Sequence, residues 1–198
     1  MNNVRRAPRA DAQRNRKRLL NAARERVAAL GPNASLEDIA KQADVGIGTL
    51  YRHFPTRADL LAAVCEDQVE ALLQLAGELR ADRGAGEAFT EWLGAAVAEM
   101  VRFRELRVIL ARNLAEGYRL SDPGRNRLMQ EVTPLLDDAI AAGRVRSDVS
   151  PASLFSMVSG IPIAAELSDD PQAEAQLLLA VLLEGLNTPA ASDTETVR

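Results

Sequence analysis

The chain has 198 residues, of which 47% are hydrophobic and 26% charged, the balance of a globular protein of one large or two small domains. No apolar run approaches the roughly 18 residues that a membrane-spanning helix needs, and no apolar signal core follows the basic start. We therefore expect a soluble, cytoplasmic protein without membrane contact. Cys65 and His53 are the only cysteine and histidine, which leaves too few ligands for a zinc site, and we expect no cofactor.

Charge is divided unevenly along the chain, although the net charge is only −4. Residues 1–57 hold twelve Lys and Arg against five Asp and Glu, a net charge of +7. Residues 58–198 hold twelve bases against twenty-three acids, a net charge of −11. This division predicts a basic N-terminal part that binds a polyanion and an acidic body that repels one.

We expect residues 13–57 to form a compact unit of three short helices, preceded by a flexible basic arm at residues 1–12. Apolar residues three or four apart predict the first helix, which Gly31 and Pro32 end. Ser35 is a typical N-cap for the second helix, and a tight turn leads into a third. The second and third helices have the spacing of a helix-turn-helix motif, although spacing alone is a weak signal.

The rest of the chain predicts six further helices. No alternating pattern typical of strands occurs, so the expected fold is all-α with about nine helices. Pro134 is expected to bend one helix or to mark its true start. Residues 188–198 are expected to form a disordered tail. The six helices are expected at about 56–80, 89–103, 106–116, 128–142, from 151 onward and over 172–186.

The last two helices carry apolar residues on more than one face. This pattern predicts burial both in the chain's own body and against a second copy. We therefore expect an isologous homodimer with a four-helix bundle across a two-fold axis. The residues expected at this interface are Leu154, Val158, Ile161, Leu178, Val181, Leu182 and Leu186.

One segment carries a specific motif. It reads VGIGTLYRHFP from Val45 to Pro55, followed by TRADLL from Thr56 to Leu61. Over roughly residues 16–61 the chain closely resembles the N-terminal DNA-binding signature of the TetR family of bacterial repressors. The remainder is similar to that family only in being acidic, helical and of suitable length.

The residues of this motif divide between the core and DNA. Leu50 and Phe54 are four apart and should face the core. The other positions of the helix are left for DNA or solvent: Ile47, Gly48, Thr49, Tyr51, Arg52 and His53. The resemblance implies phosphate or groove-edge contacts for Thr49, Tyr51, His53 and Arg57. Since strong base readers are few, Arg5, Arg6 and Arg9 of the arm are expected to reach a minor groove or phosphates.

For residues 58–187 the resemblance implies an effector-binding and dimerisation domain. A small molecule captured there would shift the dimer so that its two recognition helices no longer match a palindromic operator. Bulky or adaptable side chains that can line a cavity are Trp92, Met100, Phe103, Leu110, Tyr118, Met129 and Phe155, with Asn113 as a polar handle. Plain core packing is the alternative interpretation for each of them.

The sequence thus predicts a homodimeric transcriptional regulator that binds double-stranded DNA and is released by a small-molecule effector. A helical small-molecule-binding protein with a vestigial DNA-binding head is the alternative. An enzyme is not expected, because paired carboxylates such as Asp137 and Asp138 are adjacent in sequence and point in different directions.

Overall fold

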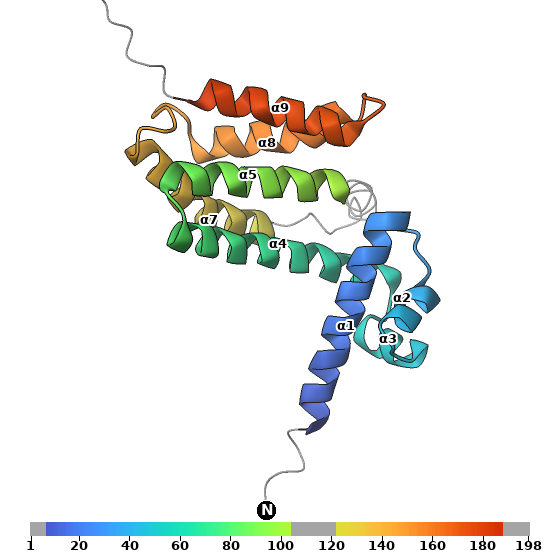
Figure 1. The fold of residues 1–198 in the computed structure, drawn as a ribbon. Helices are drawn as coiled ribbons and strands as arrows, with labels where there is room; N and C mark the ends of the chain where they lie inside the picture. Colours follow the sequence, from blue (N-terminus) through green and yellow to red (C-terminus); the bar gives the residue numbers. More distant parts are fainter. Residues whose placement is uncertain (1–6, 104–121, 188–198) are drawn as a thin grey trace, which may run out of the picture. The chain divides into compact units, whose positions relative to one another are not determined.

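The computed structural model describes residues 7–103 and 122–187, and their regular structure is entirely helical (Figure 1). The helices are α1 (Ala7–Leu30), α2 (Leu36–Gln42), α3 (Ile47–His53), α4 (Arg57–Asp82), α5 (Ala85–Arg102), α7 (Asp122–Ala141), α8 (Pro151–Ala165) and α9 (Pro171–Leu186). The all-α fold is therefore confirmed. The helix expected at 106–116 and the tail at 188–198 lie outside the described residues.

The chain divides into two compact units. We call residues 1–70 and 102–124 the head unit, and residues 71–101 and 125–198 the body unit. Helix α4 contributes residues to both of them. The expected boundary at residue 57 falls earlier than this division, because the first turns of α4 complete the core of the head.

The core of the head unit is built from α1 to α4. Leu50 and Phe54 of the motif are buried in it, as the spacing of four predicted. Leu60 and Val64 of α4 pack into the same cluster. Phe103 is also buried there, although the sequence suggested it for a ligand cavity.

Side-chain caps set several helix starts. The Ser35 hydroxyl accepts a hydrogen bond from the Asp38 amide at 3.2 Å and caps α2. Before α4, Asp59 accepts from the Thr56 amide at 2.9 Å, while the Asp59 amide donates to the Thr56 hydroxyl at 3.1 Å. Helix α1 begins at Ala7, so part of the segment expected to be a flexible arm is helical.

The body unit packs α5, α7, α8 and α9 with the end of α4 around one core. Its most deeply buried side chains include Phe89, Leu93, Leu135 and Leu136. Helices α8 and α9 form a hairpin and pack against each other (Figure 1). Helix α7 runs through Pro134 from Asp122, so this proline does not mark the start of the helix.

Candidate nucleic-acid interface

The helix-turn-helix consists of α2, the turn at 43–46 and α3. Asp44 in this turn has a φ of +49°, a left-handed conformation that costs energy for a residue other than glycine. Arg18 of α1 donates to both the backbone oxygen and the carboxylate of Asp44, each at 2.7 Å. Arg18 therefore holds the turn in place, and with it the start of α3.

The outer face of α3 carries the residues that the motif assigned to DNA. Ile47 is 38% exposed and Tyr51 is 45% exposed, although both have large hydrophobic surfaces. Gly48 and Arg52 are also exposed, whereas Thr49 and His53 are half-buried. An apolar and an aromatic side chain held outward on a seven-residue helix suit contact with base edges and sugars better than contact with water.

Gly46 and Gly48 add no side chain to this face of α3. A Cβ added at Gly46 or at Gly48 would have no other atom within 4 Å. Neither glycine is therefore required by packing inside the head. Gly46 is the N-cap of α3, where backbone N–H groups remain free to bind a phosphate.

Two arginines near the motif are occupied within the protein. Arg57 donates from Nη1 to the backbone oxygens of Pro32 at 3.1 Å and Ala34 at 2.6 Å, so it ties the start of α4 to the loop between α1 and α2. The guanidinium of Arg16 lies 5.5 Å from the ring centre of Phe54. The resemblance implied a phosphate contact for Arg57, but the structure shows a brace inside the head.

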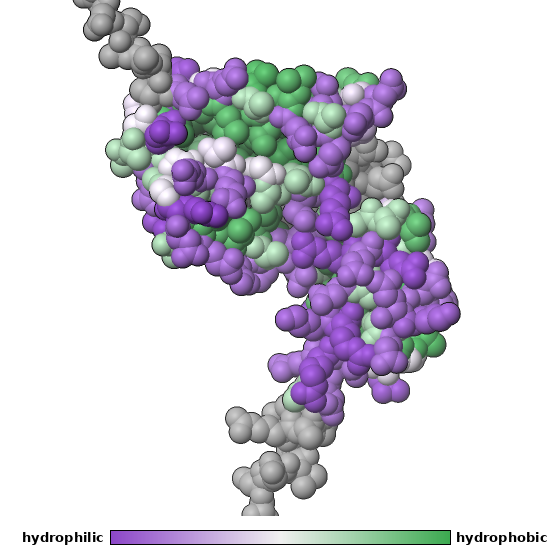
Figure 2. Space-filling model, viewed as in Figure 1, coloured by the Kyte–Doolittle hydropathy of each residue, from purple (hydrophilic) through white to green (hydrophobic). Residues whose placement is uncertain are grey.

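Other cations of the head remain available to a polyanion. Within the described residues, no hydrogen bond or ion pair involves the side chain of Lys17, Lys41 or Arg52, and all three are exposed. Arg9 lies in the first turn of α1, while Arg5 and Arg6 lie outside the described residues. Figure 2 shows that hydrophilic side chains dominate the visible face of the head unit.

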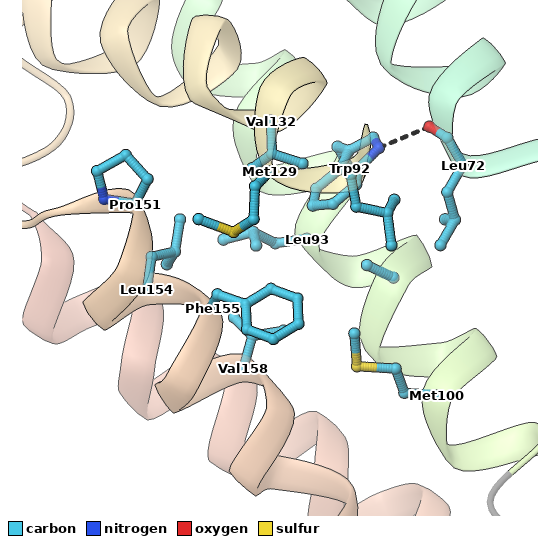
Figure 3. Close-up of a pocket in the computed structure, with 12 residues that line it drawn as sticks. Leu72, Trp92, Leu93, Met100, Met129, Val132, Pro151, Leu154, Phe155 and Val158 are labelled. Carbon is cyan, nitrogen blue, oxygen red and sulfur yellow. Dashed lines mark hydrogen bonds between the residues drawn. The ribbon is translucent and has the colours of Figure 1, made fainter. Parts of the chain in front are cut away.

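A cavity lies in the body unit between α4, α5, α7 and α8. Four of the residues expected in a ligand pocket line it: Trp92, Met100, Met129 and Phe155 (Figure 3). Sequence reasoning missed the aliphatic lining from the same helices, including Leu72, Leu93, Ala96, Val132 and Leu154. Helical spacing offered a signal, because Ala96 lies four residues from both Trp92 and Met100. Leu110, Asn113 and Tyr118 lie outside the described residues.

The expected dimer residues differ in their exposure. Leu154, Val158, Ile161 and Leu186 are buried in the core of the body unit, so as described they are not on a free surface. Val181 is 60% exposed. Leu178 and Leu182 are partly buried against the core.

Other apolar residues of α8 and α9 are exposed but were not among the expected interface residues. Ile163 of α8 is 69% exposed, Met157 of α8 and Leu177 of α9 are also exposed, and Leu167 is exposed in the loop between the two helices. Figure 2 shows hydrophobic side chains gathered over these two helices. A helix with two apolar faces places one face in the core and one outside, but its sequence pattern does not say which is which.

Two family models match the chain. The model of the tetR family of bacterial regulatory proteins matches residues 19–64, and that of the SbtR-like C-terminal domain of transcriptional regulators matches residues 84–188, more than half of the chain. The chain belongs to the TetR family. It is therefore a DNA-binding transcriptional regulator from a family that is not enzymatic.

Individual relatives agree with the TetR assignment. The TetR regulator SCO0520 from Streptomyces coelicolor is 31% identical, with a TM-score of 0.73 over 88% of this chain and 99% of its own. A TetR regulator from Mycobacterium vanbaalenii is 32% identical, with a TM-score of 0.68 over 90% and 98% of the two chains. The transcriptional repressor KstR from Rhodococcus jostii is 24% identical over 83% of this chain and 82% of its own.

Within the described residues, none of the helices is both long and apolar enough to cross a membrane. Those residues also contain no group of three or more His, Cys, Asp or Glu side chains that could hold a metal ion.

Proposed function

We propose that this TetR-family chain is a homodimeric repressor that binds a palindromic operator and is released from it by a small-molecule effector. Residues 13–57, completed by the first turns of α4, carry the DNA-binding surface, and residues 58–187 carry the effector site and the dimer contact. The exposed Ile47 and Tyr51 on the bare face of α3 are the observation on which the proposal rests.

The charge distribution supports the DNA-binding part. The segment that contains the helix-turn-helix is strongly basic in a chain of net negative charge. The side chains of Lys17, Lys41 and Arg52 are exposed and have no partner among the described residues. Each cation that meets a phosphate releases condensed counterions, so operator binding should weaken steeply as salt rises.

The outer surface of α8 and α9 supports the dimer. Its exposed apolar residues include Ile163, Leu177 and Val181, which a monomer would leave in water. Small residues such as Gly160 and Gly185 have open space around them. Two copies of this hairpin can therefore approach closely and form a four-helix bundle about a two-fold axis.

The cavity of the body unit supports the effector. Release from DNA requires the ligand to favour a state in which the two α3 helices no longer match major grooves ~34–36 Å apart. A difference of ~1–3 kcal/mol between the two states is typical of such coupling. KstR, which is similar to this chain over most of its length, is a repressor, and this supports repression as the direction of control.

The decisive experiment is to select fragments bound by the full-length chain from a genomic library, at low and moderate salt. The expected result is enrichment of one inverted repeat, with affinity that falls steeply between the two salt concentrations. Tyr51→Ala should abolish the enrichment and leave the helical content unchanged. Recovery of no common sequence, even at low salt, would contradict the proposal and favour a small-molecule-binding protein whose head no longer reads DNA.

A further inference from the structure

Among the described residues, the cavity between α4, α5, α7 and α8 is lined only by apolar surface. Its volume is about 30 Å³ in this structure, so a ligand must widen it, and the described lining residues expose no polar surface within it. Aliphatic, aromatic and thioether side chains form the described part of the wall, and none of those lining residues is charged. Figure 3 shows Met129, Phe155 and Met100 around a common space.

The one polar side-chain group of the lining is already used. The Trp92 indole Nε1 donates a hydrogen bond to the backbone oxygen of Leu72 at 2.8 Å (Figure 3). Pro151, at the start of α8, has no N–H to offer. A ligand in this cavity therefore finds no free hydrogen-bond donor on the lining side chains that the structure describes, and an ionised group placed against them would lose its hydration without a replacement.

Two helices of the wall each contain an internal proline. Met129 of α7 precedes Pro134, whose ring removes one backbone hydrogen bond from the helix. Phe155 of α8 likewise precedes Pro162. Met100 and Met129 add unbranched side chains that adjust to the shape of an apolar guest.

We infer that this cavity binds an uncharged, apolar small molecule, and that it discriminates against ligands that would bring a charge inside it. The inference rests on the proposed function, because it names the chemical class of the effector. Any polar group of the ligand remains at the mouth of the cavity, and the buried part is held by apolar contact alone.

Two fluorescent probes with the same ring skeleton test whether a charge on the ligand weakens its binding. N-phenyl-1-naphthylamine is uncharged, and 8-anilinonaphthalene-1-sulfonate carries a sulfonate on the same ring system. Trp92 is the only tryptophan of the chain and lines the cavity, so energy transfer from it reports that a probe has bound to the protein, and the substitutions below localise it. The uncharged probe should quench Trp92 saturably, with a Kd at least tenfold below that of the sulfonate.

Equal affinity for the two probes, tighter binding of the sulfonate or an absence of quenching would each overturn the inference. Operator binding is measured on the same preparation. If the chain selects an inverted repeat but binds the sulfonate more tightly, the inferred ligand class is wrong and the proposed function stands. If the chain binds the uncharged probe more tightly but selects no DNA sequence, the proposed function is wrong and the inferred ligand class stands.

Two lysine substitutions on α5 localise the effect. Met100→Lys places a charge at the cavity wall. Binding of the uncharged probe should weaken at least tenfold. The ratio between the Kd of the sulfonate and the Kd of the uncharged probe should fall. Ala98→Lys, two residues away on an exposed position, should leave both affinities unchanged. Circular dichroism checks folding, and Met100→Gln replaces the lysine variant if that chain does not fold. Identical behaviour of the position 98 and position 100 variants would place the probe elsewhere and contradict the inference.

Discussion

Arginine side chains of the head unit have two different roles. Arg18 and Arg57 donate to backbone oxygens inside the head, where they hold the turn before α3 and the loop before α2. Arg52 is exposed on α3 and has no partner among the described residues. The same residue type thus braces the motif at two positions and is free to meet DNA at a third.

The salt dependence of operator binding should separate these roles. Arg57→Ala leaves two backbone oxygens without their charged donor, so the free energy of unfolding should fall by about 1–3 kcal/mol. Operator affinity should fall too, with an unchanged slope of log affinity against log salt. Arg52→Ala should keep the stability and lower that slope by about one. A lower slope for the Arg57 variant would show that this side chain contacts phosphate after all.

Replacing Gly48 with alanine should change the stability of the protein and its DNA affinity in opposite directions. An added methyl group meets open space, and alanine favours a helix over glycine by roughly 0.5–1 kcal/mol. Gly48→Ala should therefore raise the free energy of unfolding while weakening operator binding at least tenfold, because the methyl group stands where α3 approaches the duplex.

Gly77→Ala is the matched control for that substitution. Gly77 is exposed on α4, and a Cβ added there also meets open space. This variant should gain similar stability and keep full operator affinity, as measured by urea unfolding and fluorescence anisotropy. If Gly48→Ala retains full affinity as well, α3 does not approach DNA at that position.

At the scale of the helix, the sequence predicted what local chemistry decides. The Ser35 cap and the burial of Leu50 and Phe54 follow from short-range spacing, and the structure confirms them. Phe103 was wrongly expected at the cavity, because periodicity places a residue on a face without saying which unit covers that face. The buried dimer candidates on α8 and α9 have the same explanation.

Ser150 provides a test at this scale. Its hydroxyl accepts a hydrogen bond from the Ser153 amide at 3.1 Å and caps α8, the helix that presents Pro151 and Leu154 to the cavity. Ser150→Ala should lower the free energy of unfolding by about 1 kcal/mol. Ser156→Ala is the control on the same helix, because that exposed hydroxyl only donates back to the Ala152 oxygen. Urea titration should show a shift for the first variant alone, and equal shifts would show that the cap adds nothing.

At the scale of the whole molecule, the proposed regulation requires two heads held at a fixed spacing. One head offers a seven-residue recognition helix with few strong base readers, so its affinity for a half-site is expected to be low. A dimer joins two such contacts, and the second binds at a high effective concentration. In the proposed dimer, we therefore expect the apolar outer surface of α8 and α9 to be as necessary for operator recognition as α3 is.

Disrupting the outer surface of α8 and α9 should weaken DNA binding, although the substituted residue is not one that we expect to contact DNA. Val181→Asp places a charge at an exposed position of α9 where we expect the two-fold partner, so the chain should sediment as a monomer at micromolar concentration. Operator affinity should fall at least a hundredfold while circular dichroism stays unchanged, because Val181 is not required for the core of its own chain. Ala98→Asp, at an exposed position of α5, should stay dimeric and bind DNA normally. A position 181 variant that remains dimeric would move the interface away from α9, and a monomeric one with full operator affinity would show that a single head suffices.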